Sequence, residues 1–144
     1  MSYDNPWLYN GEAFDSDKIE DYYGFVYLIE NLVDNRKYIG KKLFYSSRTK
    51  TVKKKKKKVK VESDWKKYYG SNLELISDVD KHKTQNFRRT ILRLCKTKGE
   101  CNYFEAKEQF ALDVLRDNMY YNTWIMCKVH KSHVAKSVED NKPK

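Results

Sequence analysis

The sequence predicts an α+β fold, in which a small antiparallel sheet is flanked by helices. Residues 25–29 and 37–39 are rich in the aromatic and β-branched side chains that strands favour. Asparagine and aspartate between these segments supply turn chemistry, so the two segments together predict a β-hairpin. Such a hairpin would bring Tyr27 and Tyr38, one from each strand, side by side on one face. Two helical segments further along the chain complete the mixed class.

Helix signals occur at two places after the hairpin. Ser71 and Glu74 have the spacing of a capping box, which predicts a helix from about residue 72 to residue 81. Asn102 is typical of a helix N-cap and precedes apolar residues at helical spacing. A second helix is therefore expected from residue 103 to about residue 116.

The net charge of +10 is unevenly distributed along the chain. The first 23 residues hold six acidic side chains and one basic one, so the remainder is strongly basic. Residues 50–60 include an unbroken run of lysines, which we expect to repel one another and to form a mobile loop. The run consists of Lys53, Lys54, Lys55, Lys56, Lys57 and Lys58. Clustered positive charge indicates a nucleic-acid partner, and lysine contacts with phosphates add affinity without reading bases.

The composition divides the 144 residues into three parts. Residues 1–22 are expected to form an acidic arm that packs beside the sheet with little regular structure. Residues 23–127 would form the domain, and residues 128–144 a basic tail. The three cysteines form no CxxC pair, which indicates a reducing compartment. No apolar run is long enough to span a membrane and no secretory signal is evident, so a cytoplasmic protein is expected.

The residues around Tyr27 and Tyr38, which we call the phenol pair, resemble the signature of the GIY-YIG nuclease family. Tyr38-Ile39-Gly40 matches the second half of that signature, and its spacing from Tyr27 fits the family. The first half is looser, because Phe25 stands where the family has glycine and Gly24 comes one residue earlier. Residues 87–95 fit a helix or a strand by periodicity. The resemblance favours the strand, and therefore a three-stranded antiparallel sheet flanked by helices.

The resemblance also implies the site of a DNA endonuclease like those of phages and mobile elements, homing enzymes included, acting in a bacterial or phage-infected cell. In the family's order, the expected catalytic residues are Tyr27, Tyr38, Arg48, Glu105 and Asn122. Glu105 would be the ligand of one Mg²⁺ or Mn²⁺ ion. Lys41, Lys42, the lysine run and Tyr69 are expected to contact nucleic acid, and Tyr68 or Tyr69 stands where the family has an additional polar residue.

Such an enzyme would hydrolyse a phosphodiester by in-line attack of an activated water. The Arg48 guanidinium would neutralise the phosphoryl oxygens in a bidentate manner. Tyr27 would orient the water or take its proton. A free phenol has a pKa of about 10, so the second role requires nearby positive charge.

Each assignment also has a simpler interpretation. Glu105 would equally complete a capping box with Asn102, and Glu108 one turn away is a second candidate ligand. Arg48 would equally be an ordinary basic residue of a loop, in which case Lys41 and Lys42, which are closer to the hairpin, would neutralise the phosphoryl oxygens. Asn122 would equally be a plain turn residue.

The main alternative for the whole chain is a non-catalytic basic module that binds nucleic acid. It explains the charge and the tyrosines but not the order of the five candidate residues. The chain carries no evident helix-turn-helix or zinc finger, so sequence preference should be modest unless the protein forms a homodimer. Cys127, His130 and His133 have spacing that fits three zinc ligands, and a basic tail is the competing interpretation.

Overall fold

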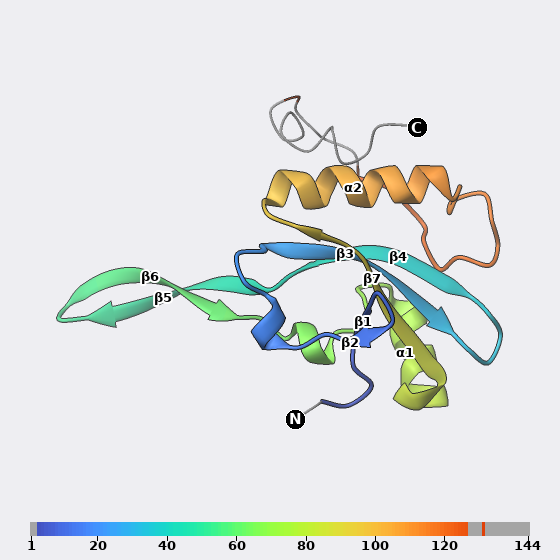
Figure 1. Cartoon of the computed structure of the whole chain (residues 1–144), viewed down its shortest axis with the longest axis horizontal. Helices are drawn as coiled ribbons and strands as arrows, with labels where there is room; N and C mark the ends of the chain where they lie inside the picture. The colour runs from blue at the N-terminus through green and yellow to red at the C-terminus, as the bar shows by residue number, and fades with distance from the viewer. Residues whose placement is uncertain (1–2, 127–130, 132–144) are drawn as a thin grey trace.

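The computed structural model describes residues 3–126 and 131, with residues 48, 50, 52, 57 and 58 described by backbone alone. Over this part of the chain it shows an α+β fold with a five-stranded mixed sheet in the order β2-β1-β7-β3-β4 (Figure 1). The strands are β1 Leu8–Tyr9, β2 Glu12–Ala13, β3 Gly24–Asn31, β4 Lys37–Leu43 and β7 Phe87–Cys95. The predicted class is confirmed, and so is the strand at residues 87–95. The prediction of three strands was wrong, because the N-terminal arm adds β1 and β2.

Strand β3 lies between β4 and β7 and pairs antiparallel with both. The β3–β4 turn is built by polar side chains, as predicted. The Asn31 side chain accepts a hydrogen bond from the backbone of Val33 (2.9 Å), and Asp34 accepts one from the backbone of Arg36 (3.0 Å). Asn35 has a φ of 67°, a left-handed conformation that asparagine tolerates well. The hairpin therefore folds from local sequence signals.

One face of the sheet is covered by helix α2, Lys98–Ala111 (Figure 1). Its apolar residues Cys101 and Phe104 pack against Val26 and Ile39 of the sheet. The N-cap is Thr97, whose side chain accepts a hydrogen bond from the backbone of Glu100 (3.0 Å). The helix thus begins five residues before the predicted start, and the prediction that Asn102 caps it was wrong.

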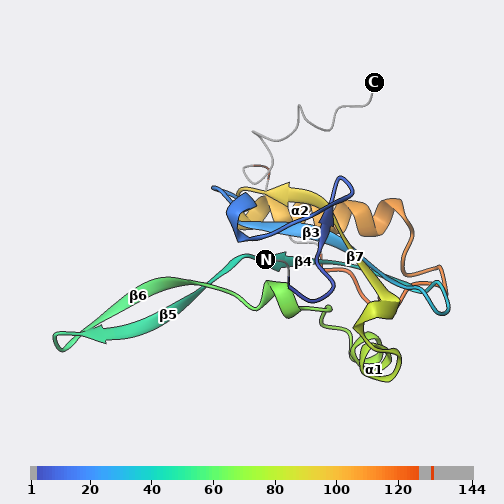
Figure 2. The same ribbon diagram turned by 60° about the horizontal axis from the view of Figure 1, so that its bottom comes forward.

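The opposite face is covered by the N-terminal arm, the short helix η2 Trp65–Lys67 and helix α1 Leu73–His82 (Figure 2). Trp7 of the arm is fully buried, and its indole nitrogen donates to the carbonyl of Trp65 (2.7 Å). The described part of the arm therefore packs beside the sheet as expected, but it contains regular structure. Helix α1 is capped by Asn72, one residue after the serine that the capping box had indicated. Among the described residues, neither helix is long and apolar enough to cross a membrane.

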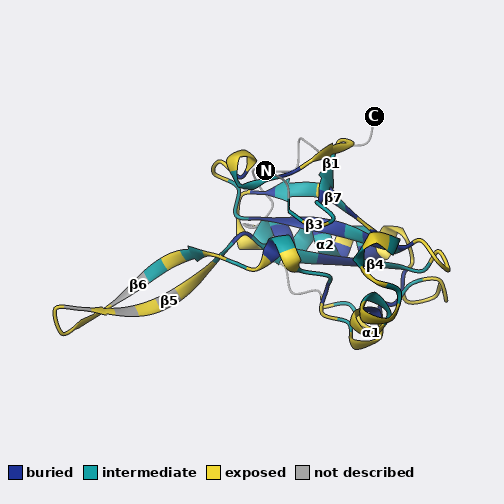
Figure 3. Ribbon diagram, turned by 90° about the horizontal axis from the view of Figure 1, so that it is seen from below, coloured by how far each residue is buried: buried dark blue, intermediate teal, exposed yellow. Residues whose placement is uncertain are grey.

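The lysine-rich segment does not form the predicted loop. It forms a two-stranded antiparallel ribbon, with β5 at Tyr45–Val52 and β6 at Lys55–Glu62. The β5–β6 ribbon extends away from the rest of the molecule in both ribbon views (Figures 1 and 2). None of its described side chains is buried (Figure 3).

Candidate active site

The two phenols lie on the same face of the β3–β4 hairpin. The register pairs Tyr27 with Gly40 and Ile29 with Tyr38, so the tyrosines are diagonal neighbours. Their ring centroids are 6.2 Å apart, which confirms the predicted pairing. Gly40 is required by this arrangement, because a Cβ added there would lie 2.7 Å from Cζ of Tyr27. The glycine of the second half-signature therefore makes room for the first tyrosine.

Tyr27 is the buried member of the pair. Only 1% of its surface is exposed, and its ring packs against those of Trp7 (5.1 Å) and Tyr68 (6.0 Å). Burial raises the pKa of Tyr27 well above its ordinary value, and neighbouring Tyr68, Tyr38 and Glu105 raise it further. The phenol therefore keeps its proton, which suits a hydrogen-bond donor better than a general base.

Tyr38 is only half-buried and its ring borders a cavity of about 450 Å³. Its hydroxyl is 3.2 Å from the hydroxyl of Ser71, just before helix α1. Burial raises the pKa of Tyr38, and the hydrogen bond with Ser71 partly opposes that rise. Eight polar residues of four segments border the cavity: Tyr38, Lys41, Ser71, Asn72, Glu105, Gln109, Asn122 and Thr123.

Glu105 comes from the middle of α2 and faces the same cavity as Tyr38. Burial raises the pKa of its carboxyl, while the charge of Lys41 and a hydrogen bond from the backbone of Lys41 lower it. The negative charge of Glu105 in turn raises the pKa of both Tyr27 and Tyr38, so the carboxylate favours the protonated form of both phenols. Because Thr97 caps α2, the capping-box interpretation of Glu105 was wrong. Glu108 is not among the described residues that line the cavity.

The two lysines of β4 lie on opposite faces of the strand, as successive residues must. Lys41 lines the cavity, and its Nζ donates to Oδ1 of Asn102 (2.6 Å). Lys42 instead forms an ion pair with Asp64 (2.7 Å) and lies over the ring of Tyr68 (4.1 Å). Of the two, only Lys41 is placed beside Glu105.

Asn122 holds the backbone of β4 in place. Its side chain accepts from the N–H of Ile39 (3.1 Å) and donates to the carbonyl of Ile39 (2.8 Å). Gln109 of α2 donates to the same carbonyl (3.0 Å). Both groups fix the strand between Tyr38 and Gly40, so they position the phenol pair. Gln109 was not among the predicted residues, although its spacing of four residues from Glu105 puts the two on one helix face.

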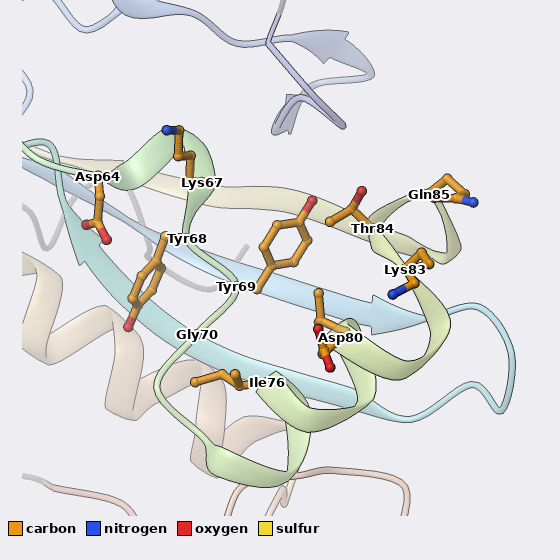
Figure 4. Close-up of a pocket in the computed structure, with 11 residues that line it drawn as sticks. Asp64, Lys67, Tyr68, Tyr69, Gly70, Ile76, Asp80, Lys83, Thr84 and Gln85 are labelled. Atoms are coloured by element: carbon orange, nitrogen blue, oxygen red, sulfur yellow. The ribbon is translucent and has the colours of Figure 1, made fainter.

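Two other candidates come from other segments of the chain. Arg48 is in β5, paired with Val59, and its side chain is not described, so its meeting with the phenols stays a prediction. Tyr69 borders a second cavity of about 730 Å³ between η2 and α1, and Figure 4 shows its ring and that of Tyr68 pointing in opposite directions. The hydroxyl of Tyr69 accepts from Asn5 (3.1 Å).

The described residues contain no cluster of three or more histidine, cysteine, aspartate or glutamate side chains that fits a metal ion. The proposed zinc ligands Cys127, His130 and His133 lie outside the described residues. Glu105 is a single half-buried carboxylate that opens onto a polar cavity. This donor set fits Mg²⁺, which is usually held by one or two carboxylates with water and phosphate as the other ligands.

The family of the chain follows from comparison with known proteins. A family model described as the putative endonuclease segE, GIY-YIG domain, matches residues 7–125. No curated protein and no solved structure matches the chain. The match spans the arm, the phenol hairpin, the lysine-rich ribbon and both helices. The chain therefore belongs to the GIY-YIG endonuclease family.

Proposed function

We propose that this protein is a divalent-metal-dependent endonuclease that hydrolyses the phosphodiester bonds of DNA. The observation that carries the proposal is the shared cavity, where Glu105 and Tyr38 converge with Lys41 and with Tyr27 packed behind. A carboxylate, a cation and a hydroxyl donor are the groups that phosphodiester hydrolysis requires. Membership of the endonuclease family supports the same conclusion.

Glu105 is the residue that would hold the ion. Glu105 is half-buried, so its carboxylate attracts a nearby cation more strongly than an exposed carboxylate would. A Mg²⁺ or Mn²⁺ ion bound there would supply positive charge at the phosphoryl oxygens and at the leaving oxygen. Lys41 and Asn102 hold each other beside this carboxylate, which keeps one protein cation in place.

The phenols are proposed to orient the attacking water. Tyr38 borders the cavity and has one hydroxyl partner, Ser71, at hydrogen-bond distance. Tyr27 stays protonated in its buried environment and would donate a hydrogen bond, either directly or through Tyr38. Arg48 would contribute a bidentate contact to the non-bridging oxygens, as the family resemblance implies. Catalysis would thus depend on positioning and charge more than on a protein base.

DNA is the substrate that the charge distribution favours. Strand β4 carries lysines beside Tyr38, and the lysine-rich ribbon follows β4 directly in the chain. Cytoplasmic conditions suit the protein, because Cys95 and Cys101 are free and buried. Because lysine contacts with phosphates do not read bases, cleavage should show modest sequence preference unless the protein forms a homodimer.

The test is nicking of supercoiled plasmid with Mg²⁺, compared with a chelator. Wild-type protein should relax the plasmid only when the ion is present. Glu105→Gln should be at least about a hundredfold slower, since a single electrostatic group commonly contributes that much. Glu108→Gln, the same substitution one turn along α2, is the matched control and should cleave like the wild type.

Cleavage by Glu105→Gln after chelation and restoration of Mg²⁺ would overturn the assignment of the ligand. Wild-type protein that binds plasmid tightly but never cuts it would instead favour the non-catalytic module. DNA binding by Glu105→Gln, measured by fluorescence anisotropy, should stay within a few-fold of wild type.

A further inference from the structure

The β5–β6 ribbon is joined by backbone pairing along its length, and none of its described side chains is buried. Eight residue pairs join the strands, from Tyr45–Glu62 at the root to Val52–Lys55 at the tip. Isolated two-stranded ribbons are at best marginally stable, and directly opposed like charges such as those at Lys50 and Lys57 weaken them further. The exposure of its described side chains indicates a role outside the core.

Positive charge is present on both faces of the ribbon and at its tip. Lys55 and Lys56 are successive strand residues, so they lie on opposite faces, and both are exposed. Lys53 and Lys54 form the turn and are also exposed. Between residues 45 and 62 the sole acidic residue is Glu62 at the root. A flat phosphate surface would contact one face, whereas a groove between two phosphodiester backbones would contact both.

The dimensions of the ribbon match one such groove. Eight residues per strand extend roughly 26 Å, and the strands lie about 4.8 Å apart. The major groove of B-form DNA is about 12 Å wide and admits a two-stranded β-ribbon. The corresponding groove of A-form RNA is too narrow for side chains to enter. Along B-form DNA the ribbon would cover roughly seven base pairs.

The ribbon root is fixed relative to the candidate active site. One residue, Phe44, separates β4 from β5, and its ring packs against Phe25 (4.9 Å) and Trp65 (5.2 Å). The backbone N–H of Ser63, just after β6, donates to the carbonyl of Phe44 (2.7 Å). The strand that carries Tyr38 and Lys41 therefore leads directly into the ribbon.

We propose that the β5–β6 ribbon lies in the major groove of duplex DNA beside the scissile phosphate, and so restricts the enzyme to duplex substrates. The inference rests on the proposed function, and it assigns the groove and the form of the substrate. The ribbon contacts about seven base pairs on one side of the cleavage position. It adds affinity through phosphates on both walls and does not select a base sequence.

Two variants separate the ribbon from the rest of the protein. In the first, an Asn-Gly turn replaces residues 49–58 and joins Arg48 directly to Val59, its partner on the other strand. Arg48 itself is retained. In the second, Lys53→Asn is combined with Lys54→Gly. This pair keeps the full length and relieves a turn whose two lysines have φ of 51° and 65°, a conformation that asparagine and glycine favour.

Binding is measured by anisotropy in the Glu105→Gln background, so that cleavage does not consume the probe. The probes are a plain duplex, a duplex with bulky substituents on C5 of its pyrimidines, which project into the major groove, and the matching single strand. With the full ribbon, the bulky duplex should bind about tenfold more weakly than the plain duplex. The shortened variant should bind both duplexes equally. Its salt dependence should fall by a slope of up to about 6, since it lacks seven lysines.

Equal binding of the plain and bulky duplexes by the full ribbon would overturn the inference. So would displacement by a ligand that fills the minor groove, or single-strand binding as tight as duplex binding. The turn variant should retain the discrimination between duplexes with a salt slope lower by about 2. Loss of discrimination there would also contradict the proposal. Failure of plasmid nicking with groove-dependent binding intact would count against the enzymatic function alone.

Discussion

The packed sheet and the β5–β6 ribbon use charge in opposite ways. Arg89 of strand β7 is fully buried, Glu105 of the helix packed on the sheet is half-buried, and each has specific neighbours. In the ribbon, the described lysines are exposed and their strands hold one another by backbone pairing. The difference indicates two separate roles. Packing fixes the positions of the groups that catalysis needs, whereas the ribbon supplies affinity for DNA and needs no precise geometry.

Arg89 shows how far the sheet depends on fixed geometry. Its guanidinium donates to the carbonyls of Tyr68 (2.8 Å), Lys66 (2.9 Å) and Asn5 (2.5 Å) and lies over the ring of Trp7 (4.6 Å). It thereby ties the arm and the segment before α1 to strand β7. Tyr68, held in this way, packs against Tyr27 and supports the phenol pair from behind.

The largest expected effect on stability is that of Arg89→Met. Loss of the buried guanidinium leaves several partly buried carbonyls without this donor, so the free energy of unfolding should fall by about 3–5 kcal/mol. Arg88→Met is the matched control: its exposed pair with Glu30 (3.0 Å) should contribute less than about 1 kcal/mol. Urea denaturation followed by circular dichroism measures both. An equal decrease in the free energy of unfolding for the two variants would show that the buried arginine stabilises the fold no more than the exposed one.

Gly40→Ala should have the next largest effect. Its added methyl group overlaps the phenol of Tyr27, which the core holds on all sides, so the free energy of unfolding should fall by about 1–3 kcal/mol. Displacement of the phenols should also slow plasmid nicking well beyond the loss of folded protein. A folded Gly40→Ala variant with wild-type nicking would show that the phenol pair is not needed. Ser47→Ala, at an exposed position of β5, is the control and should change neither property.

Glu105→Gln should have a smaller, pH-dependent effect on stability. Burial raises the pKa of Glu105 in the folded state above the unfolded value of about 4.3, so ionisation of the carboxyl destabilises the fold. The variant should therefore have the higher Tm near neutral pH, and the difference should disappear below about pH 4. Mg²⁺ should raise the Tm of the wild type alone. A variant stabilised equally at every pH would contradict the assigned burial.

The smallest stability effect is expected in the ribbon. Lys55→Gln combined with Lys56→Gln should change the free energy of unfolding by less than about 0.5 kcal/mol, because both side chains are exposed. The salt dependence of DNA binding should fall by a slope of about 2. Unchanged salt dependence would show that these lysines do not contact phosphates.

Much of the sheet could be predicted from local sequence. The β3–β4 hairpin and β7 have clear composition signals, and the turn is closed by Asn31 and Asp34, the residue types that predicted it. Strands β1 and β2 could not be predicted, because each has two residues and exists through pairing within the sheet. The ribbon was missed because charge repulsion indicated a loop, whereas cross-strand pairing determines its structure.

The candidate site was predictable where a side chain's chemistry marks it. Tyr38 and Glu105 border one cavity, and Tyr27 packs against Tyr38. The order of these residues along the chain follows the family signature, and their catalytic roles stay predictions. The start of α2 was misplaced because Asn102 has the chemistry of a cap but instead accepts from Lys41 inside the helix. The buried roles of Gln109 and Arg89 depend on backbone carbonyls brought together only by the fold.

The most direct test is a crystal of the wild-type protein with Mn²⁺ and a duplex that has one non-cleavable linkage. The anomalous signal should show an ion within about 2.5 Å of a Glu105 carboxylate oxygen, with a phosphate between the ion and Tyr38. An ion bound instead at Asp64 or Asp80, which line the other cavity, would contradict the account. So would a phosphate bound away from the phenol pair.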